Sequence, residues 1–284
     1  MERNLKIILP VLVLVASWIF YERGQGEANS IPSVDLVDSD RVLALSEKPT
    51  QVKALEKPPS RVPDFAAIQD VNQKKQAFID FILPAIYASN KAIAVERDFL
   101  KQLKPNQMSV KQKQRFEALA VKYQQPRKKD QTMVQWHADL LIKVDIIPPA
   151  LALAQAANES AWGTSRFAVE GMNFFGHWCF SVGCGLVPER RPEGQIYEVR
   201  VFNSVEDSVA AYMLNLNALI NYETLRNLRA QLRQSKQALN SELLAYGLID
   251  YSAKREDYIR ELQAMIRFNR WQHYDKKPKG EWHG

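Results

Sequence analysis

Residues 148–179 read PPALALAQAANESAWGTSRFAVEGMNFFGHWC. The first half of this stretch predicts a helix, because two prolines suit a first helical turn and the alanine- and leucine-rich run after them has high helix propensity. The run carries almost no charge, so we expect the helix to be buried on most sides. One acidic residue, Glu159, lies at the end of this run, shortly before Gly163 interrupts the helical pattern.

The position of Glu159 predicts a carboxyl group that keeps its proton near neutral pH. The C-terminus of a helix carries partial negative charge, which disfavours an ionised carboxylate there. Partial burial acts in the same direction, because it penalises the charged form. A protonated carboxylic acid of this kind is what a general acid for glycoside cleavage requires. The alternative interpretation of Glu159 alone is a solvated glutamate at a helix end, beside core aromatic residues.

The residues after Glu159 extend this pattern into a longer motif. Residues 159–165 read ESAWGTS and residues 173–176 read NFFG, with Ala168 between them. These strings resemble the core motif of the bacterial endo-β-N-acetylglucosaminidase domain, glycoside hydrolase family 73, also described as the mannosyl-glycoprotein endo-β-N-acetylglucosaminidase-like domain. Over residues 65–271 the chain also resembles the Bax-type proteins of Gram-negative bacteria.

The resemblance implies a lysozyme-like α+β fold that is mainly α-helical, with a small β-hairpin lobe. It also implies cleavage of peptidoglycan glycan strands, with Glu159 as the general acid. Aromatic side chains suit a glycan groove, because the flat C–H faces of sugar rings stack on them. Of two tyrosines near the last helix, Tyr251 matches the family's groove tyrosine, and we expect Tyr258 to pack that helix. The substrate-binding residues that follow from the resemblance are Trp162, Asn173, Phe175 and Tyr251.

A second catalytic carboxylate is expected in the β lobe. Residues 196–202 alternate between apolar and polar side chains, which predicts a strand, and the nearby prolines and glycine supply turns. We expect this lobe to face the helix that ends at Glu159. Among its acids Glu189, Glu193 and Glu198, the resemblance favours Glu189. Alternatively, Glu189 is a surface salt-bridge residue, and the N-acetyl group of the sugar or a single-acid scheme replaces it.

The cysteines indicate a disulfide more than a metal site. The chain has two, Cys179 and Cys184, in a loop that contains glycine. Such a close pair can form a disulfide when the chain is exported. A structural zinc site needs four ligands at characteristic spacings, and His177 is the one further candidate nearby. We therefore expect a disulfide, with no metal and no other cofactor.

The sequence divides into five segments. Residues 1–22 contain an apolar run after basic residues and predict a signal anchor or a signal peptide. The anchor is favoured, because bulky residues stand where a signal peptidase requires small ones, and Trp18 and Tyr21 suit a membrane interface. Residues 23–64 form a proline-containing linker. The remaining segments are a helical region over 65–130, a glucosaminidase catalytic domain over 131–275 and a tail over 276–284.

Three local features carry structural expectations. Pro84 is expected to kink or divide the helical stretch after residue 65. Ser204 is expected to cap a helix, and together with Ser208 to have a structural role. Further along, we expect a solvated face for three arginines on one side of a helix, Arg226, Arg229 and Arg233.

The net charge of +6 favours anionic partners. Nucleic acid, a membrane surface and the anionic bacterial wall are such partners, but the sequence has no nucleic-acid-binding motif. It also lacks a Gly-x-Ser-x-Gly elbow, a phosphate-binding glycine loop and a His-Glu-x-x-His helix. We expect peptidoglycan and the inner membrane as partners, and no nucleic acid.

The leading hypothesis is a periplasmic endo-β-N-acetylglucosaminidase, anchored to the inner membrane of a Gram-negative bacterium. A lytic transglycosylase or muramidase that uses the same glutamate is the second hypothesis. A non-catalytic wall-binding protein on the same fold is the third.

Overall fold

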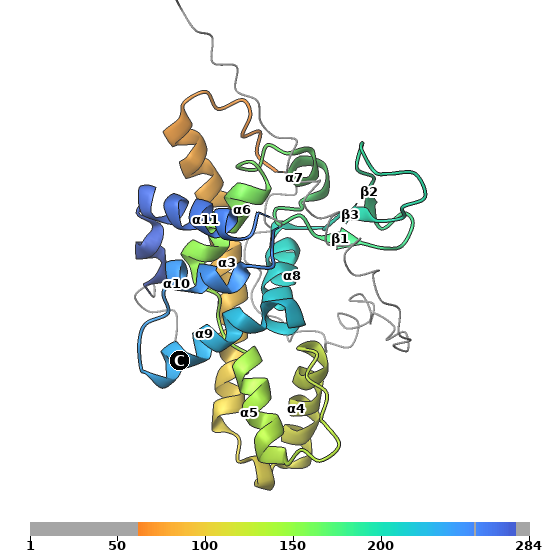
Figure 1. The fold of residues 1–284 in the computed structure, drawn as a ribbon, viewed down its shortest axis with the longest axis vertical. Helices are drawn as coiled ribbons and strands as arrows, with labels where there is room; N and C mark the ends of the chain where they lie inside the picture. Colours follow the sequence, from red (N-terminus) through yellow and green to blue (C-terminus); the bar gives the residue numbers. More distant parts are fainter. Residues whose placement is uncertain (1–61, 253, 277–284) are drawn as a thin grey trace, which may run out of the picture.

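The structure is a computed structural model that describes residues 62–252 and 254–276. The predicted membrane segment, nearly all of the predicted linker and most of the tail lie outside these residues. The described chain is mainly α-helical, with a small antiparallel sheet at the side of the helical body (Figure 1). The predicted fold class is therefore confirmed.

The helices lie in both the predicted helical region and the predicted catalytic domain. In chain order they are α3 (Val71–Gln102), η1 (Pro105–Gln107), α4 (Val110–Lys122), α5 (Met133–Lys143), α6 (Pro149–Glu159), α7 (Arg166–Gly171), α8 (Val205–Ala218), η2 (Ile220–Tyr222), α9 (Glu223–Gln234), α10 (Ser241–Ala245), η3 (Tyr246–Leu248), α11 (Glu256–Phe268) and η4 (Trp271–Asp275).

Helix α6 lies at the centre of the core, as its composition predicts. Its side chains from Pro149 to Ala157 are all buried, and it packs against α3, α10, α11 and η4. The helix begins without a capping side chain next to it in the sequence. Instead, Oδ1 of Asp275 accepts a hydrogen bond of 2.9 Å from the N–H of Ala150, which satisfies a free donor of the first turn. Packing along the helix and this cap at its first turn fix the position of α6, and thereby the position of Glu159 at its other end.

Helix α3 runs along the helical body and continues through Pro84 (Figure 1). Pro84 therefore does not divide the stretch. Its cost of about 3 kcal/mol in a helix interior is offset because Phe78 and Ile86, on either side of it, are buried in the core. By length and composition α3 could cross a membrane. It packs against α6 and α8, however, as a core helix does.

Side-chain caps define the starts of several described helices, among them α4, α5 and α8. Ser109 and Gln112 form a capping box on α4, and Thr132 and Gln135 form another on α5. Ser204 caps α8 by accepting a hydrogen bond from the N–H of Asp207, which confirms the predicted cap. One turn later, Oγ of Ser208 accepts from the N–H of Phe174 at 3.3 Å. This bond ties α8 to the NFFG loop, so Ser208 has the predicted structural role.

The small sheet contains β1 (Trp178–Cys179), β2 (Gly185–Leu186) and β3 (Glu198–Arg200), in the order β1-β3-β2. Both pairings are antiparallel, and Val199 pairs with Trp178 on one side and Leu186 on the other. The predicted strand over 196–202 is thus shorter, and the end of the NFFG loop adds a strand that was not predicted. Gly185 is required here, because a Cβ would lie 2.1 Å from the carbonyl oxygen of Val199.

The expectation of a solvated arginine face on α9 is wrong for Arg226 and Arg229, whereas Arg233 is exposed. Arg226 and Arg229 are 3% and 1% exposed. Arg229 donates to the carbonyl oxygens of Ile142, Lys143 and Asp145 at 3.0 Å. Burial alone would raise the pKa of Asp145, but the hydrogen bond from Arg233 and the charges of neighbouring arginines lower it overall. Arg229 therefore satisfies carbonyl groups at the end of α5 and in the α5–α6 connection, whereas Arg226 donates to Leu216 and Leu219 at the end of α8.

Candidate active site

Glu159 is a half-buried carboxyl group at the C-terminal end of α6. Its Oε1 accepts a hydrogen bond of 2.8 Å from the hydroxyl of Tyr258, at the start of α11. Burial raises the pKa of Glu159 to about 7 and outweighs the bond from Tyr258 and the charge of Lys254, which both lower it. Near neutral pH the group is therefore present in both forms, so it can donate a proton and take one back.

The other oxygen of this carboxyl group, Oε2, faces Gly176. A Cβ placed on Gly176 would lie 3.8 Å from Oε2, and Gly176 is exposed. Its φ of +68° lies in the left-handed region that favours glycine. Gly176 therefore places no side chain beside Oε2, while Oε1 accepts the hydrogen bond from Tyr258.

A sharp turn places Glu159 at the end of its helix. Ala161, Trp162 and Gly163 all have left-handed φ values, of +51°, +59° and +76°. Such values are uncommon outside glycine and cluster at functional sites. A Cβ on Gly163 would lie 2.5 Å from the ring of Phe65, so the ring needs a glycine there. Oγ of Ser160 braces the turn by accepting from the N–H of Gly163 at 2.8 Å.

Trp162 is half-buried against other aromatic rings. It makes edge contacts with Phe78 and Trp271, each with 5.6 Å between ring centroids. The ammonium of Lys75 lies 5.2 Å from the centre of the Trp162 ring. Packing against α3 and η4 thus fixes the orientation of the Trp162 ring. Only the exposed part of the ring can contact a ligand.

Asn173 and Phe175 build the loop from the inside, and burial argues against the direct substrate contact expected of them. Each is 2% exposed. The Nδ2 of Asn173 donates to the carbonyl oxygens of His177 and Arg200, at 2.8 and 2.9 Å, which joins the loop to β3. The ring of Phe175 stacks on Tyr212, with centroids 4.0 Å apart. Both side chains therefore stabilise the conformation of the loop beside Glu159.

Tyr251 contacts the same loop. Its hydroxyl donates to the carbonyl oxygen of Phe175 at 2.9 Å, and its ring stacks on Tyr258 with centroids 5.5 Å apart and planes 6° apart. The sequence indicated Tyr251 for the groove and Tyr258 for packing. In the structure Tyr258 is the tyrosine bonded to Glu159, and Tyr251 supports it.

The acids of the β lobe have different environments. Glu198 is 3% exposed and accepts hydrogen bonds from the N–H groups of Gly183 and Gly185, at 3.0 and 2.8 Å. These bonds lower the pKa of Glu198 and bind it to the loop. Glu189 and Glu193 are exposed in the connection between β2 and β3. Glu198 is therefore a structural carboxylate, while Glu189 makes no hydrogen bond or ion pair that is seen among residues 62–252 and 254–276.

Cys179 and Cys184 form a disulfide, five residues apart, that closes the loop between β1 and β2. Their sulfur atoms and the carboxylate of Glu198 lie within 4.8 Å of one another, a grouping that could suit a metal ion. A disulfide provides no thiolates, however, and Glu198 is already bonded to the loop. This chemistry does not fit a metal site.

His177 is a packed histidine. Its ring lies beside Phe175 and Phe202, with centroids 6.2 and 5.6 Å away. Burial and the charge of Arg200 lower its pKa to about 4. The ring is therefore neutral near neutral pH.

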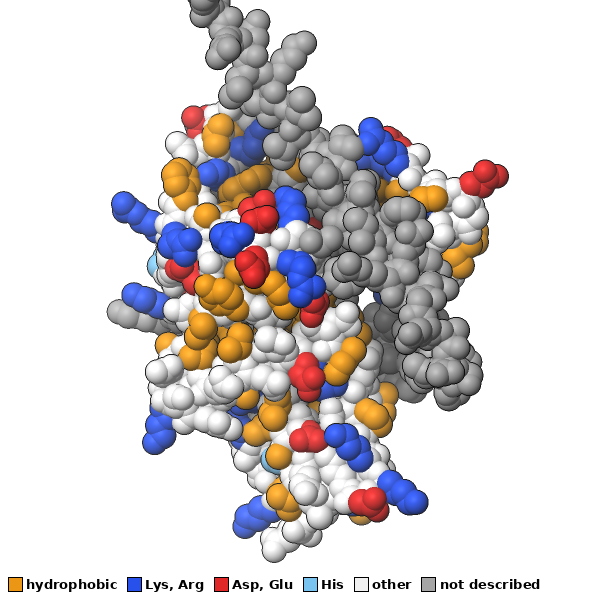
Figure 2. Space-filling view, viewed as in Figure 1, with side chains coloured by type: hydrophobic (Ala, Val, Ile, Leu, Met, Phe, Trp, Pro, Cys, Tyr) orange, Lys and Arg blue, Asp and Glu red, His pale blue; other side chains and the backbone are white. Residues whose placement is uncertain are grey.

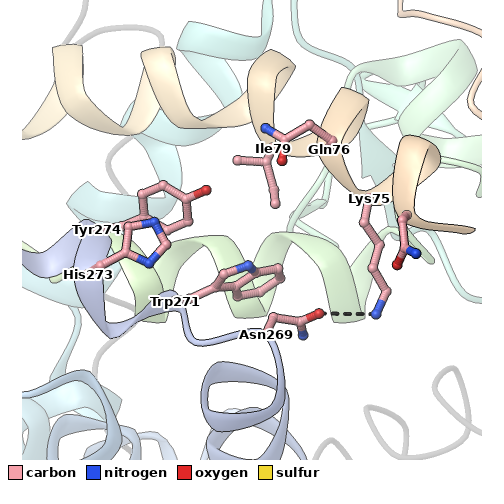
Figure 3. A pocket seen from close by; sticks show the side chains of 8 residues that line it. Lys75, Gln76, Ile79, Asn269, Trp271, His273 and Tyr274 are labelled. Carbon is pink, nitrogen blue, oxygen red and sulfur yellow. Dashed lines mark hydrogen bonds between the residues drawn. The ribbon is translucent and has the colours of Figure 1, made fainter.

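A cavity of about 420 Å³ lies elsewhere, between the start of α3 and η4 (Figure 3). Lys75 crosses toward Asn269 and donates to its Oδ1 at 3.0 Å, while Trp271, His273 and Tyr274 line the other wall. Glu159 does not line this cavity. On the face seen in Figure 2, acidic and basic side chains are interspersed over the helical body.

Comparison with known proteins agrees with this geometry. A family model described as mannosyl-glycoprotein endo-beta-N-acetylglucosaminidase matches residues 134–270, which include Glu159, Tyr251 and Tyr258. Protein bax of Escherichia coli (strain K12) is 34% identical over 212 residues, which cover 74% of this chain and 75% of that protein. The comparison with solved structures gave no significant match. The chain belongs to the Bax-type proteins with a glucosaminidase domain, and it is a glycosidase-type enzyme with a lysozyme-like fold.

Proposed function

We propose that the protein is a peptidoglycan hydrolase, an endo-β-N-acetylglucosaminidase that cleaves the β-1,4 bond after N-acetylglucosamine. The observation that supports this most is the environment of Glu159. Its pKa of about 7 keeps a usable fraction protonated near neutral pH, and Oε2 faces an exposed glycine. A general acid for glycoside cleavage needs both properties.

In the proposed reaction, Glu159 gives its proton to the glycosidic oxygen as the bond from C1 to that oxygen breaks. The bonding electrons remain on the leaving oxygen, and positive charge develops at C1. Water then adds at C1 and loses a proton to a base. Glu189 is our candidate for that base, because it is exposed in a loop of the β lobe while Glu198 is bonded to the backbone.

Trp162 and Tyr251 are our candidates for contact with the sugar rings. Both are half-buried and packed against the elements around Glu159. Asn173 and Phe175 act through the loop that they shape.

The engagement of Glu198 by two N–H groups favours a second candidate, a lytic transglycosylase. That reaction needs a single acid and base, Glu159, because the C6 hydroxyl of the muramic acid attacks C1 and no water is activated. It cleaves the muramic bond and leaves a 1,6-anhydro sugar. If the variant Glu189→Gln keeps full activity, this candidate gains support.

Mass spectrometry of purified sacculi digested with the protein separates these functions. Fragments with N-acetylglucosamine at the reducing end support the glucosaminidase. Fragments that end in an anhydro-muramic acid support the transglycosylase. Binding without any released fragment would indicate a wall-binding protein and would contradict both enzymes.

We further propose that the protein acts in the periplasm, anchored to the inner membrane through residues 1–22. The apolar run and its bulky flanking residues support an anchor over a cleaved signal. Cell fractionation and amino-terminal sequencing test this proposal. A mature protein that begins near Ala28 would contradict the anchor.

A further inference from the structure

Three buried side chains form a line that ends at Glu159. Tyr212, on α8, donates from its hydroxyl to Oε1 of Gln155 at 2.5 Å. The Nε2 of Gln155 donates to the hydroxyl oxygen of Tyr258 at 3.0 Å, and Tyr258 donates to Oε1 of Glu159 at 2.8 Å. Tyr212 and Gln155 are 0% exposed and Tyr258 is 2% exposed. Three helices, α8, α6 and α11, thus contribute to one continuous relay.

This relay has a direction. A tyrosine hydroxyl has one hydrogen, and an amide has an oxygen that only accepts and a nitrogen that only donates. Because the amide nitrogen of Gln155 donates to Tyr258, the single hydrogen of Tyr258 is free to point at Glu159. Oε1 of Glu159 is then an acceptor in both protonation states, and the proton of the acid belongs on Oε2, which faces Gly176.

The reverse direction would work against catalysis. If the amide of Gln155 turned over, its oxygen would accept the hydrogen of Tyr258. Oε1 of Glu159 would then find a partner only by carrying the proton itself and donating it inward, away from the exposed side. The donor at the far end, Tyr212, satisfies the amide oxygen and so favours the productive direction.

We infer that Gln155 and Tyr212 are positioning residues, which direct the hydroxyl of Tyr258 so that Glu159 carries its transferable proton on Oε2. This inference rests on the proposed role of Glu159 as the general acid. Neither residue touches the substrate, and each acts through Tyr258. The pattern is visible in α6, where Gln155 lies four residues before Glu159 and so shares its helix face.

Other groups also face Glu159 and have to be kept constant. The charge of Lys254 lowers its pKa, the charge of Glu261 raises it, and a hydrogen bond from Asn158 lowers it. The neighbouring tyrosines Tyr212, Tyr222, Tyr251 and Tyr258 all have raised pKa values, with burial as the main cause, so they remain neutral near pH 7.

The variants Tyr258→Phe and Tyr212→Phe remove single hydroxyls and keep the rings. Loss of a hydrogen bond to a charged group corresponds to roughly 1–2 pKa units. Tyr258→Phe should therefore raise the pKa of Glu159 and move the alkaline limb of the pH–rate profile to higher pH by about that amount. Tyr212→Phe leaves the amide of Gln155 without a preferred orientation. The hydroxyl hydrogen of Tyr258 is then shared between Oε1 of Gln155 and Oε1 of Glu159. We expect a smaller shift in the same direction, roughly 0.3 pH unit, since the productive orientation is then populated only about half of the time.

The decisive comparison is the double variant in the full-length protein. Because Tyr212 acts through Tyr258, Tyr212→Phe should move the alkaline limb in the wild-type background and leave it in place in the Tyr258→Phe background. Tyr123→Phe is the matched control. It removes an equally buried hydroxyl, 2.5 Å from a carboxylate of Glu96, and should leave the limb unchanged.

Two results would overturn the inference. One is a folded Tyr212→Phe variant whose limb coincides with wild type. The other is a shift that persists in the Tyr258→Phe background. If Tyr212→Phe does not fold, Gln155→Met gives a complementary test. Met offers no competing acceptor, so the hydroxyl of Tyr258 still points at Glu159 and the alkaline limb should stay near its wild-type position, whereas a displacement as large as that in Tyr258→Phe would overturn the inference. A fully active Glu159→Gln variant would instead refute the proposed function itself, so the two failures are distinguishable.

Discussion

The ion pair between Lys254 and Glu261 offers a two-way test of the electrostatics at Glu159. Nζ of Lys254 lies 2.9 Å from Oε1 of Glu261. The charge of Lys254 lowers the pKa of Glu159, and the charge of Glu261 raises it. Neutralising each residue alone should therefore move that pKa in opposite directions. Lys254→Met should raise it, and Glu261→Gln should lower it.

The size of these shifts is limited by solvent. The two side chains are 40% and 43% exposed, and exposed charge pairs interact by about 0.2–1 kcal/mol. Since one pKa unit corresponds to about 1.4 kcal/mol, each shift should be about 0.1–0.7 unit. Activity needs protonated Glu159, so it falls as the pH rises through the pKa of about 7. Lys254→Met should move this alkaline limb to higher pH, and Glu261→Gln to lower pH.

The assay is the initial rate of fragment release from purified sacculi as a function of pH. At low ionic strength the two limbs should separate. In about 1 M salt, where the Debye length is about 3 Å, they should converge. Lys113→Met removes the same charge from an exposed pair on α4 and should leave the limb in place. If both variants move the limb in one direction, Glu159 is not the group that titrates.

Three further predictions concern stability. Folding raises the pKa of Glu159 from 4.5 to about 7, so the stability linked to its proton is complete below about pH 4.5 and is lost as the pH rises through 7. Glu159→Gln should therefore be more stable than wild type by about 1–3 kcal/mol in thermal unfolding above pH 7, and an equal gain at pH 4 would contradict this. Asp145→Ala leaves the guanidinium of Arg229 buried without its anion and should cost about 3–5 kcal/mol in denaturant unfolding, whereas a cost below about 1 kcal/mol would show that the cluster is unimportant. Replacing Cys179 and Cys184 by serine removes a short cross-link worth about 2 kcal/mol and should speed proteolysis within the β lobe, and an unchanged rate would argue against a stabilising role.

The sequence was most informative where local chemistry decides the structure. The prolines and the apolar run before Glu159 predict α6, and burial of nearly all its side chains follows from the lack of charge. The cap of α8 at Ser204 is equally local. The environment of Glu159 was also foreseeable, because a helix end and partial burial both favour the protonated acid.

Contacts between distant residues were not foreseeable in the same way. Tyr258 is 99 residues from Glu159, and nothing near either residue indicates that they meet. Tyr251 and Tyr258 have the same chemistry, so only their positions in the folded chain distinguish them. One signal for the relay was present in the sequence, since Gln155 is the one polar residue between Pro148 and Asn158.

The arginines of α9 show a second limit. Arg226 and Arg229 lie close to the buried Leu225 and Leu232 along the helix, which could have indicated that they share its inner face. The residues that satisfy Arg229 belong to the end of α5 and the connection after it. A charged residue on an apolar face is solvated or buried according to such distant acceptors, which a helical pattern does not contain.

The most direct test of our account compares wild type with Glu159→Gln on purified sacculi. Gln keeps the shape of the side chain and an oxygen for Tyr258, but it has no proton to transfer near neutral pH. We predict that the variant binds sacculi as wild type does and releases no soluble fragments. Release at the wild-type rate would show that another group supplies the proton.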